Sequence, residues 1–116
     1  MSEVNTYNIN IHQGESWTMT LTVKDENDTA KNLTDYTGKM QIRDKPNGKV
    51  YADLNTTDGG MTINGTYGEV ELVMTAAQTA ALNLRNAVYD VYVESSAGTI
   101  TYLLKGTVTI HARVSQ

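Results

Sequence analysis

Residues 88–94 read Val-Tyr-Asp-Val-Tyr-Val-Glu, and this stretch decides the fold class. Tyr89, Val91 and Val93 alternate with Asp90, Tyr92 and Glu94, a period of two that is typical of a half-buried β-strand. The small polar sequence 95–98, which ends in Gly, predicts a turn. A second run of β-branched and aromatic residues follows at 99–110. The stretch 87–113 therefore predicts an antiparallel hairpin in an all-β domain.

The same alternation recurs along the rest of the chain. The following side chains are predicted to face the core: Ile9, Ile11, Trp17, Met19, Leu21, Val23, Met40, Ile42, Val50, Ala52, Leu54, Met61, Ile63, Val70, Leu72 and Met74. Turn residues separate these runs, most clearly at 45–49, where Pro precedes Asn-Gly. Seven to nine short strands at this spacing predict a two-sheet antiparallel β-sandwich in preference to a closed barrel.

One short helix is predicted at about residues 75–84. Thr75 and Gln78 have the spacing of a capping box, in which each side chain satisfies a backbone N–H of the other residue. In a Greek-key sandwich such a helix carries the chain from one sheet to the other. We expect Ala80, Leu82 or Leu84 to cover the end of the core there.

Composition sets limits on partners and on location. The 116 residues predict a single domain, 1–116, which can bury roughly two thirds of its unfolded surface without disulfides, since the chain has no Cys. The net charge of −4 argues against binding to nucleic acid or to an anionic membrane. Lys39, Arg43, Lys45 and Lys49 are interrupted by Asp44, which indicates a solvated hairpin. No signal peptide or membrane span is evident, so we expect synthesis in a cytoplasm.

Candidate chemistry is sparse, and we predict no catalytic residues, no metal site and no cofactor. His12 and His111 lie on the first and last strands, which can be neighbours in a sandwich, but no further ligand accompanies them. Asp25, Asn27 and Asp28 lack the Gly and Glu that an EF-hand needs, which favours a polar turn. Asp90, in an otherwise apolar strand, is expected to make a structural hydrogen bond rather than act in catalysis.

Five phrases in one order carry a family resemblance: residues 13–16, 32–43, 68–80, 88–91 and 103–108. Together they resemble tail or baseplate structural proteins of tailed phages and prophages, and are similar to the immunoglobulin-like N-terminal module of phage upper baseplate proteins. The resemblance implies an immunoglobulin-like sandwich and a non-enzymatic virion component, made in the bacterial host cytoplasm. Family members often carry helical or fibre segments after the module, and their absence here favours an adaptor or accessory protein.

On this reading the protein works by docking on phage structural proteins or by self-association. The expected interface comprises Ile9 and Ile11, on an uncharged strand without Pro, together with Tyr51 and Tyr92, whose phase places them on outer faces. One alternative is a carbohydrate-binding module for host-surface glycans, although Trp17 lies on the core phase of its strand. Another is a small phage-encoded inhibitor of a host protein.

Overall fold

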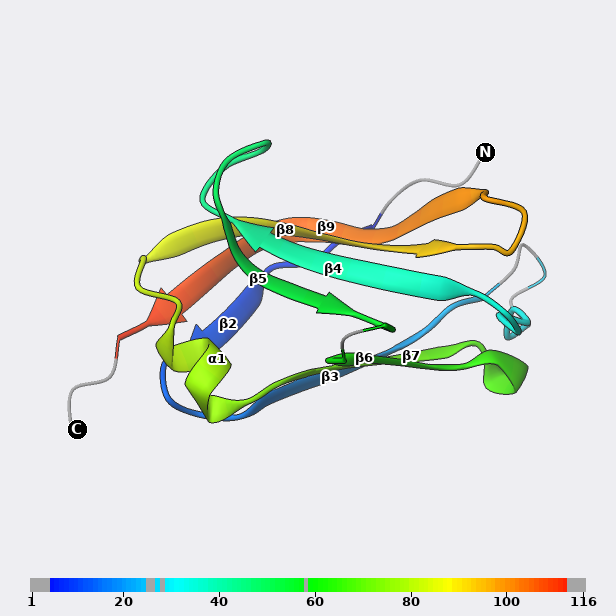
Figure 1. The fold of residues 1–116 in the computed structure, drawn as a ribbon, viewed down its shortest axis with the longest axis horizontal. Helices are drawn as coiled ribbons and strands as arrows, with labels where there is room; N and C mark the ends of the chain where they lie inside the picture. Colours follow the sequence, from blue (N-terminus) through cyan, green and yellow to red (C-terminus); the bar gives the residue numbers. More distant parts are fainter. Residues whose placement is uncertain (1–4, 25–26, 28, 58, 113–116) are drawn as a thin grey trace.

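Two β-sheets pack face to face in the computed structural model, which describes residues 5–24, 27, 29–57 and 59–112 (Figure 1). The large sheet has six strands: β1 (Asn5–Thr6), β2 (Ile9–His12), β4 (Thr37–Arg43), β5 (Val50–Asn55), β8 (Asn86–Glu94) and β9 (Ile100–His111). The small sheet has three: β3 (Trp17–Thr22), β6 (Met61–Asn64) and β7 (Glu69–Met74). A 3-10 turn (Gly65–Tyr67) and one helix, α1 (Ala76–Ala80), complete the fold. The predicted all-β sandwich with a short helix is confirmed.

The strand order is that of an immunoglobulin-like sandwich. The large sheet runs β9-β8-β4-β5 and the small sheet β3-β7-β6, as in a variable-type domain whose second sheet lacks its first strand. One part of the prediction is wrong, because the sheets are not wholly antiparallel. β1 and β2 both run parallel to β9, with Ile9 opposite Val108 and Ile11 opposite Ile110.

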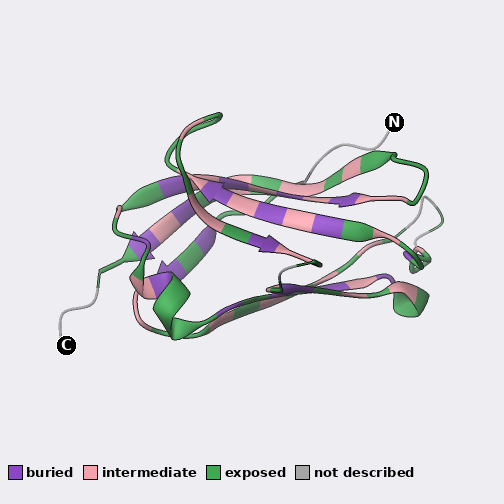
Figure 2. Cartoon of the chain, viewed as in Figure 1, coloured by how far each residue is buried: buried purple, intermediate pink, exposed green. Residues whose placement is uncertain are grey.

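The core lies between the two sheets, where the buried faces of their strands meet (Figure 2). The residues predicted to face inward that are buried include Ile9, Ile11, Met40, Ile42, Leu54, Met61, Val70, Leu72, Met74, Tyr89, Val91 and Val93. Val50 is an exception, and 38% of it is exposed. The register shifts between Ile42 and Arg43, so that Ala52 pairs with Ile42 but Val50 pairs with Arg43. Tyr51 is the extra residue of this bulge, and Val50 therefore faces outward with Arg43.

The helix closes one end of the core between β7 and β8. The predicted capping box is present: Gln78 N donates to Thr75 Oγ1 at 3.2 Å, and Thr75 N donates to Gln78 Oε1 at 2.8 Å. The helix is shorter than predicted, since it ends at Ala80, but Leu82 is buried as expected.

The loop between β4 and β5 rises from the large sheet on the side away from the small sheet (Figure 1). Gly48 N donates to Lys45 O at 2.8 Å, which closes a turn with Pro46 and Asn47 at its centre. Asn47 has a φ of 62°, the left-handed conformation expected at the third position of a type II turn. This loop forms one wall of a groove on the outer face of the large sheet.

Candidate binding groove on the large sheet

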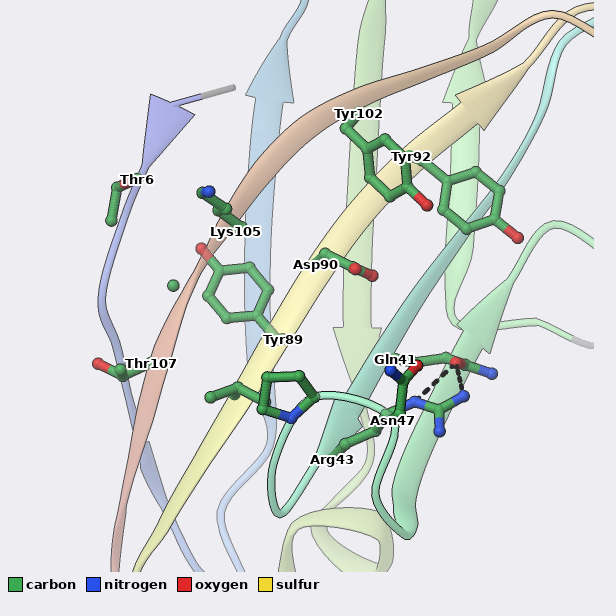
Figure 3. Close-up of a pocket in the computed structure, with 13 residues that line it drawn as sticks. Thr6, Gln41, Arg43, Asn47, Tyr89, Asp90, Tyr92, Tyr102, Lys105 and Thr107 are labelled. Carbon is green, nitrogen blue, oxygen red and sulfur yellow. Dashed lines mark hydrogen bonds between the residues drawn. The ribbon is translucent and has the colours of Figure 1, made fainter. Parts of the chain in front are cut away.

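A groove of about 560 Å³ lies on the outer face of the large sheet. We call it the outer groove. Its lining residues come from β1, β4, β8, β9 and the β4–β5 loop: Thr6, Gln41, Arg43, Pro46, Asn47, Val88, Tyr89, Asp90, Tyr92, Tyr102, Lys105, Gly106 and Thr107. Figure 3 shows the two tyrosines Tyr92 and Tyr102 at one end and Asn47 of the loop toward the other. Tyr92 also lines a second hollow of about 320 Å³ beside β5, so it lies between two depressions.

A bulge in β9 brings the two tyrosines together. Val91 pairs with Leu104, but the next residue, Tyr92, pairs with Tyr102, which leaves Leu103 as an extra residue. This extra residue turns Tyr102 outward beside Tyr92. The two ring centroids are 5.4 Å apart and the ring planes are inclined at 62°. Tyr102 is 48% exposed, and Ile100, two residues earlier on the same face, is 50% exposed. Tyr92, which is half-buried, lies on this face with the exposed Tyr102 and Ile100, and we call these three residues the tyrosine cluster.

A chain of hydrogen bonds fixes the wall of the groove formed by β4 and its loop. Arg43 donates from Nη2 to Gln41 Oε1 at 2.8 Å and from Nη1 to Gly48 O at 2.7 Å. Gln41 in turn donates to Asp53 at 2.9 Å. Burial alone would raise the pKa of Asp53, but the hydrogen bonds from Gln41 and Asn55 and the charges of Lys39 and Arg43 together hold the pKa below its ordinary value. The network joins β4 and β5 to the loop and leaves Arg43 in a fixed position.

Two charged groups of the outer groove have no partner of their own. In the described part of the chain, neither the carboxylate of Asp90 nor the ammonium of Lys105 makes a hydrogen bond or an ion pair. The prediction of a structural hydrogen bond for Asp90 is therefore wrong, because its partners across the sheet are Gln41, which bonds to Asp53, and Lys105. Burial raises the pKa of Asp90, and the nearby Arg43 only partly offsets this.

The arrangement is suited to binding. The outer groove contains one unpaired acid and one unpaired base, but no histidine or pair of carboxylates that could share acid and base work. Among the described residues no cluster of three or more His, Cys, Asp or Glu side chains could hold a metal ion. Exposed aromatic residues beside unpaired polar groups are typical of surfaces that contact a partner.

The structure separates the four residues predicted for the interface. Ile9 and Ile11 are buried, at 4% and 0% exposed, so their side chains cannot form a contact surface. The period of two predicted this burial, and only the backbone of β2 could contribute to an interface. Tyr51 lies at the bulge of β5, packs partly against the core, and has the Lys49 ammonium 5.0 Å from its ring centroid. Tyr92 does lie on the outer face, in the groove.

Sequence reasoning missed Tyr102, Ile100 and Lys105. Lys105 and Tyr102 are three residues apart, an odd spacing that would place them on opposite faces of a regular strand. The bulge at Leu103 puts them on one face, and nothing in the local sequence marks that bulge. The only available signal was the prediction that Tyr92 faces outward.

The two histidines are neighbours, as their positions on the first and last strands allowed. His12 and His111 are paired in register, and their rings stack with centroids 4.6 Å apart. The Nε2 atom of His111 lies 3.1 Å from Asn10 Oδ1, and both histidines are exposed. Stacked rings do not direct their nitrogens to a common point, so the pair does not form a metal site as it stands.

Two other sequence candidates contribute little to a site. Trp17 is half-buried and packs against the core, as its phase predicted. Asp25 and Asp28 of the suggested polar turn lie outside the described residues.

Comparison with known proteins adds no relative. A scan of the sequence against protein-family models finds no match, and a search of curated proteins also finds none. Within the part of the chain that the structure describes, none of the helices could span a bilayer.

Proposed function

We propose that this protein is a non-enzymatic docking module of a phage virion, which binds another structural protein through the outer face of its large sheet. The tyrosine cluster is the single observation that carries the docking role. Tyr102 and Ile100 are each about half exposed, and Tyr92 lies beside them in a groove. Aromatic residues of this kind supply most of the binding free energy at protein interfaces when a partner covers them.

Polar groups around the tyrosine cluster support specific docking. Asp90 and Lys105 have unpaired charges in the groove, so a partner with complementary groups gains bonds there without breaking any within this protein. Arg43 is held by Gln41 and Gly48, which keeps the groove wall rigid and lowers the entropy lost on binding.

The place in a virion is supported by the sequence resemblance alone. The five phrases that carry it include residues 88–91 and 103–108, which contribute to the outer groove. A tail or baseplate adaptor needs a stable domain and an exposed docking surface, and an immunoglobulin-like sandwich is a fold that provides both.

Quantitative mass spectrometry of purified phage particles tests the virion assignment. We expect the protein in the particles at a copy number that is a fixed ratio to the tail proteins. Its absence from particles, together with capture of a host protein from an uninfected extract, would instead identify it as a phage-encoded inhibitor.

A carbohydrate-binding module is the second candidate, and one observation favours it. Tyr92 and Tyr102 offer aromatic surface in a groove that also presents the polar side chains of Asn47, Asp90 and Lys105, a combination suited to the alternating apolar and polar faces of a sugar. Trp17 does not contribute, since it packs against the core on the opposite sheet. A glycan array decides this candidate: specific signal that is lost in Tyr92→Ala supports it, and an array without signal removes it.

A further inference from the structure

The strand β3 has one open edge. It pairs only with β7, and in the described part of the chain no strand pairs with its other side. Val23 N donates to Gly68 O at 2.8 Å. Every second residue before Val23, namely Leu21, Met19 and Trp17, therefore also directs its backbone N–H and C=O groups toward β7. The backbone N–H and C=O groups of the alternate residues, Thr18, Thr20 and Thr22, therefore point toward the open edge.

The open edge arises from the path of the first strand. In a constant-type immunoglobulin sandwich the first strand pairs with the strand equivalent to β3. Here β1 and β2 both pair with β9 in the other sheet, so no strand among the described residues takes this position. In consequence Trp17, Met19 and Leu21 are only half-buried, whereas their partners on β7 are fully buried.

Nothing on β3 protects the edge from pairing. Its six residues, Trp-Thr-Met-Thr-Leu-Thr, include no Pro and no charge. Natural proteins usually place Lys, Pro or a bulge on an exposed edge to prevent strand addition. The register with β7 is continuous from Trp17 to Thr22, so no bulge turns the edge away either.

We propose that a second copy of this chain occupies the edge, with the two β3 strands antiparallel about a two-fold axis at Thr20. The sequence around Thr20 is self-complementary in this register. Thr18 faces Thr22 of the second copy, and Met19 faces its Leu21, so that threonines pair with threonines and apolar residues with apolar residues. A shift by one residue would destroy this match.

The open backbone groups agree with the same register. In an antiparallel pair centred on Thr20, the residues that exchange hydrogen bonds are Thr18, Thr20 and Thr22. These are the residues whose N–H and C=O groups point to the open edge. The two small sheets would form one continuous sheet across the dimer, and the half-buried row of Trp17, Met19 and Leu21 would gain apolar neighbours.

Sedimentation velocity over about a hundredfold range of protein concentration tests the proposal. We expect the wild-type chain to pass from monomer to dimer as concentration rises. Thr20→Lys places two like charges opposite each other at the two-fold axis, so we expect it to remain monomeric. Thr62→Lys, an exposed threonine on the opposite edge strand of the same sheet, is the matched control and should dimerise like the wild type.

Two results would overturn the proposal. One is a wild-type chain that stays monomeric throughout the range, and the other is a Thr20→Lys variant that dimerises as the wild type does. Amide hydrogen exchange gives a second measurement that does not depend on a variant: Thr18, Thr20 and Thr22 should gain protection on dimerisation. Protection of the outer groove instead would assign the dimer to the large sheet. The proposal is independent of the docking role, because Tyr92→Ala should leave this dimer intact.

Discussion

At the scale of single residues, Tyr89 connects the core to the segment between β1 and β2. It is 4% exposed, and its hydroxyl donates to the carbonyl of Tyr7 at 2.6 Å. Gly106 makes this contact possible, because a Cβ there would lie 2.2 Å from the same carbonyl oxygen. Burial raises the pKa of Tyr89 to about 12, so the hydroxyl keeps its proton and its bond well above neutral pH.

We predict that Tyr89→Phe lowers the free energy of unfolding by about 1 kcal/mol, the usual value of one buried hydrogen bond. Urea unfolding at neutral pH measures it. Tyr67→Phe is the control, since Tyr67 is 63% exposed, and it should change stability by less than about 0.5 kcal/mol. Equal effects of the two substitutions would show that the bond to Tyr7 contributes nothing.

The difference in stability between the wild type and Tyr89→Phe should also depend on pH in the alkaline range. The unfolded state of the wild type releases the Tyr89 proton near pH 10, whereas the folded state holds it until about pH 12. The contribution of the hydroxyl is therefore complete below pH 10 and is lost as the pH rises toward 12. The advantage of the wild type over Tyr89→Phe should shrink in that interval.

The pKa values of Asp90 and Asp53 are shifted in opposite directions, so replacing each carboxylate should change stability in opposite directions. The folded pKa of Asp90 is raised by burial, so unfolding becomes easier as the pH rises above the ordinary value of 3.8. Asp90→Asn should therefore be more stable than the wild type at pH 7, and the difference should vanish in acid. The folded pKa of Asp53 is lowered, so Asp53→Asn should be less stable at pH 7. Urea unfolding from pH 3 to 7 measures both, and a destabilising Asp90→Asn would contradict this assignment.

At the scale of elements, the helix α1 is joined to the turn after β2 by one buried threonine. Thr79 is 0% exposed; its hydroxyl donates to Glu15 O at 2.9 Å and accepts from Gly14 N at 3.0 Å. The Gln13 side chain adds a bond to Leu82 O at 2.9 Å. These contacts, more than helix propensity, hold a five-residue helix in place.

Thr79→Val keeps the shape of the side chain but leaves the amide of Gly14 and the carbonyl of Glu15 without their partner. We predict a loss of about 1–3 kcal/mol in the free energy of unfolding. Thr62→Val, at an exposed strand position, is the control and should be close to neutral. If thermal unfolding shows no difference between the two variants, the link between the helix and the turn has no energetic role.

Strands in which buried and exposed residues alternate regularly were predictable from the sequence. The β-bulges, which add one residue to a strand, were not. The inward faces of β7 and β8 follow from the period of two, and the start of α1 follows from the Thr75 and Gln78 spacing. The bulges at Tyr51 and Leu103 depend on twist and on neighbouring strands, which the local sequence does not encode. The candidate site is built on the second bulge, and for that reason only Tyr92 of the tyrosine cluster was predicted.

At the scale of the whole molecule, the position of the first strand distinguishes this fold from a constant-type immunoglobulin sandwich. The sequence allowed the first and last strands to be neighbours, but it did not show which of the two sheets the first strand would join. The choice depends on long-range contacts such as Tyr89 to Tyr7, and on Asn8 Oδ1, which accepts from Thr107 N at 3.2 Å. The result is a sandwich with two surfaces of different kind: an aromatic groove on the large sheet and an open strand edge on the small one.

The most direct test of the docking account is quantitative affinity capture from a phage-infected lysate with matched tyrosine variants. We predict that the double variant Tyr92→Ala and Tyr102→Ala, shown to be folded by circular dichroism, captures at least about tenfold less of the structural partner than the wild type. Tyr67→Ala replaces a tyrosine on the 3-10 turn that is even more exposed than Tyr102, and it should capture as much as the wild type. Equal capture by all three proteins would contradict the claim that the outer face of the large sheet is the docking surface.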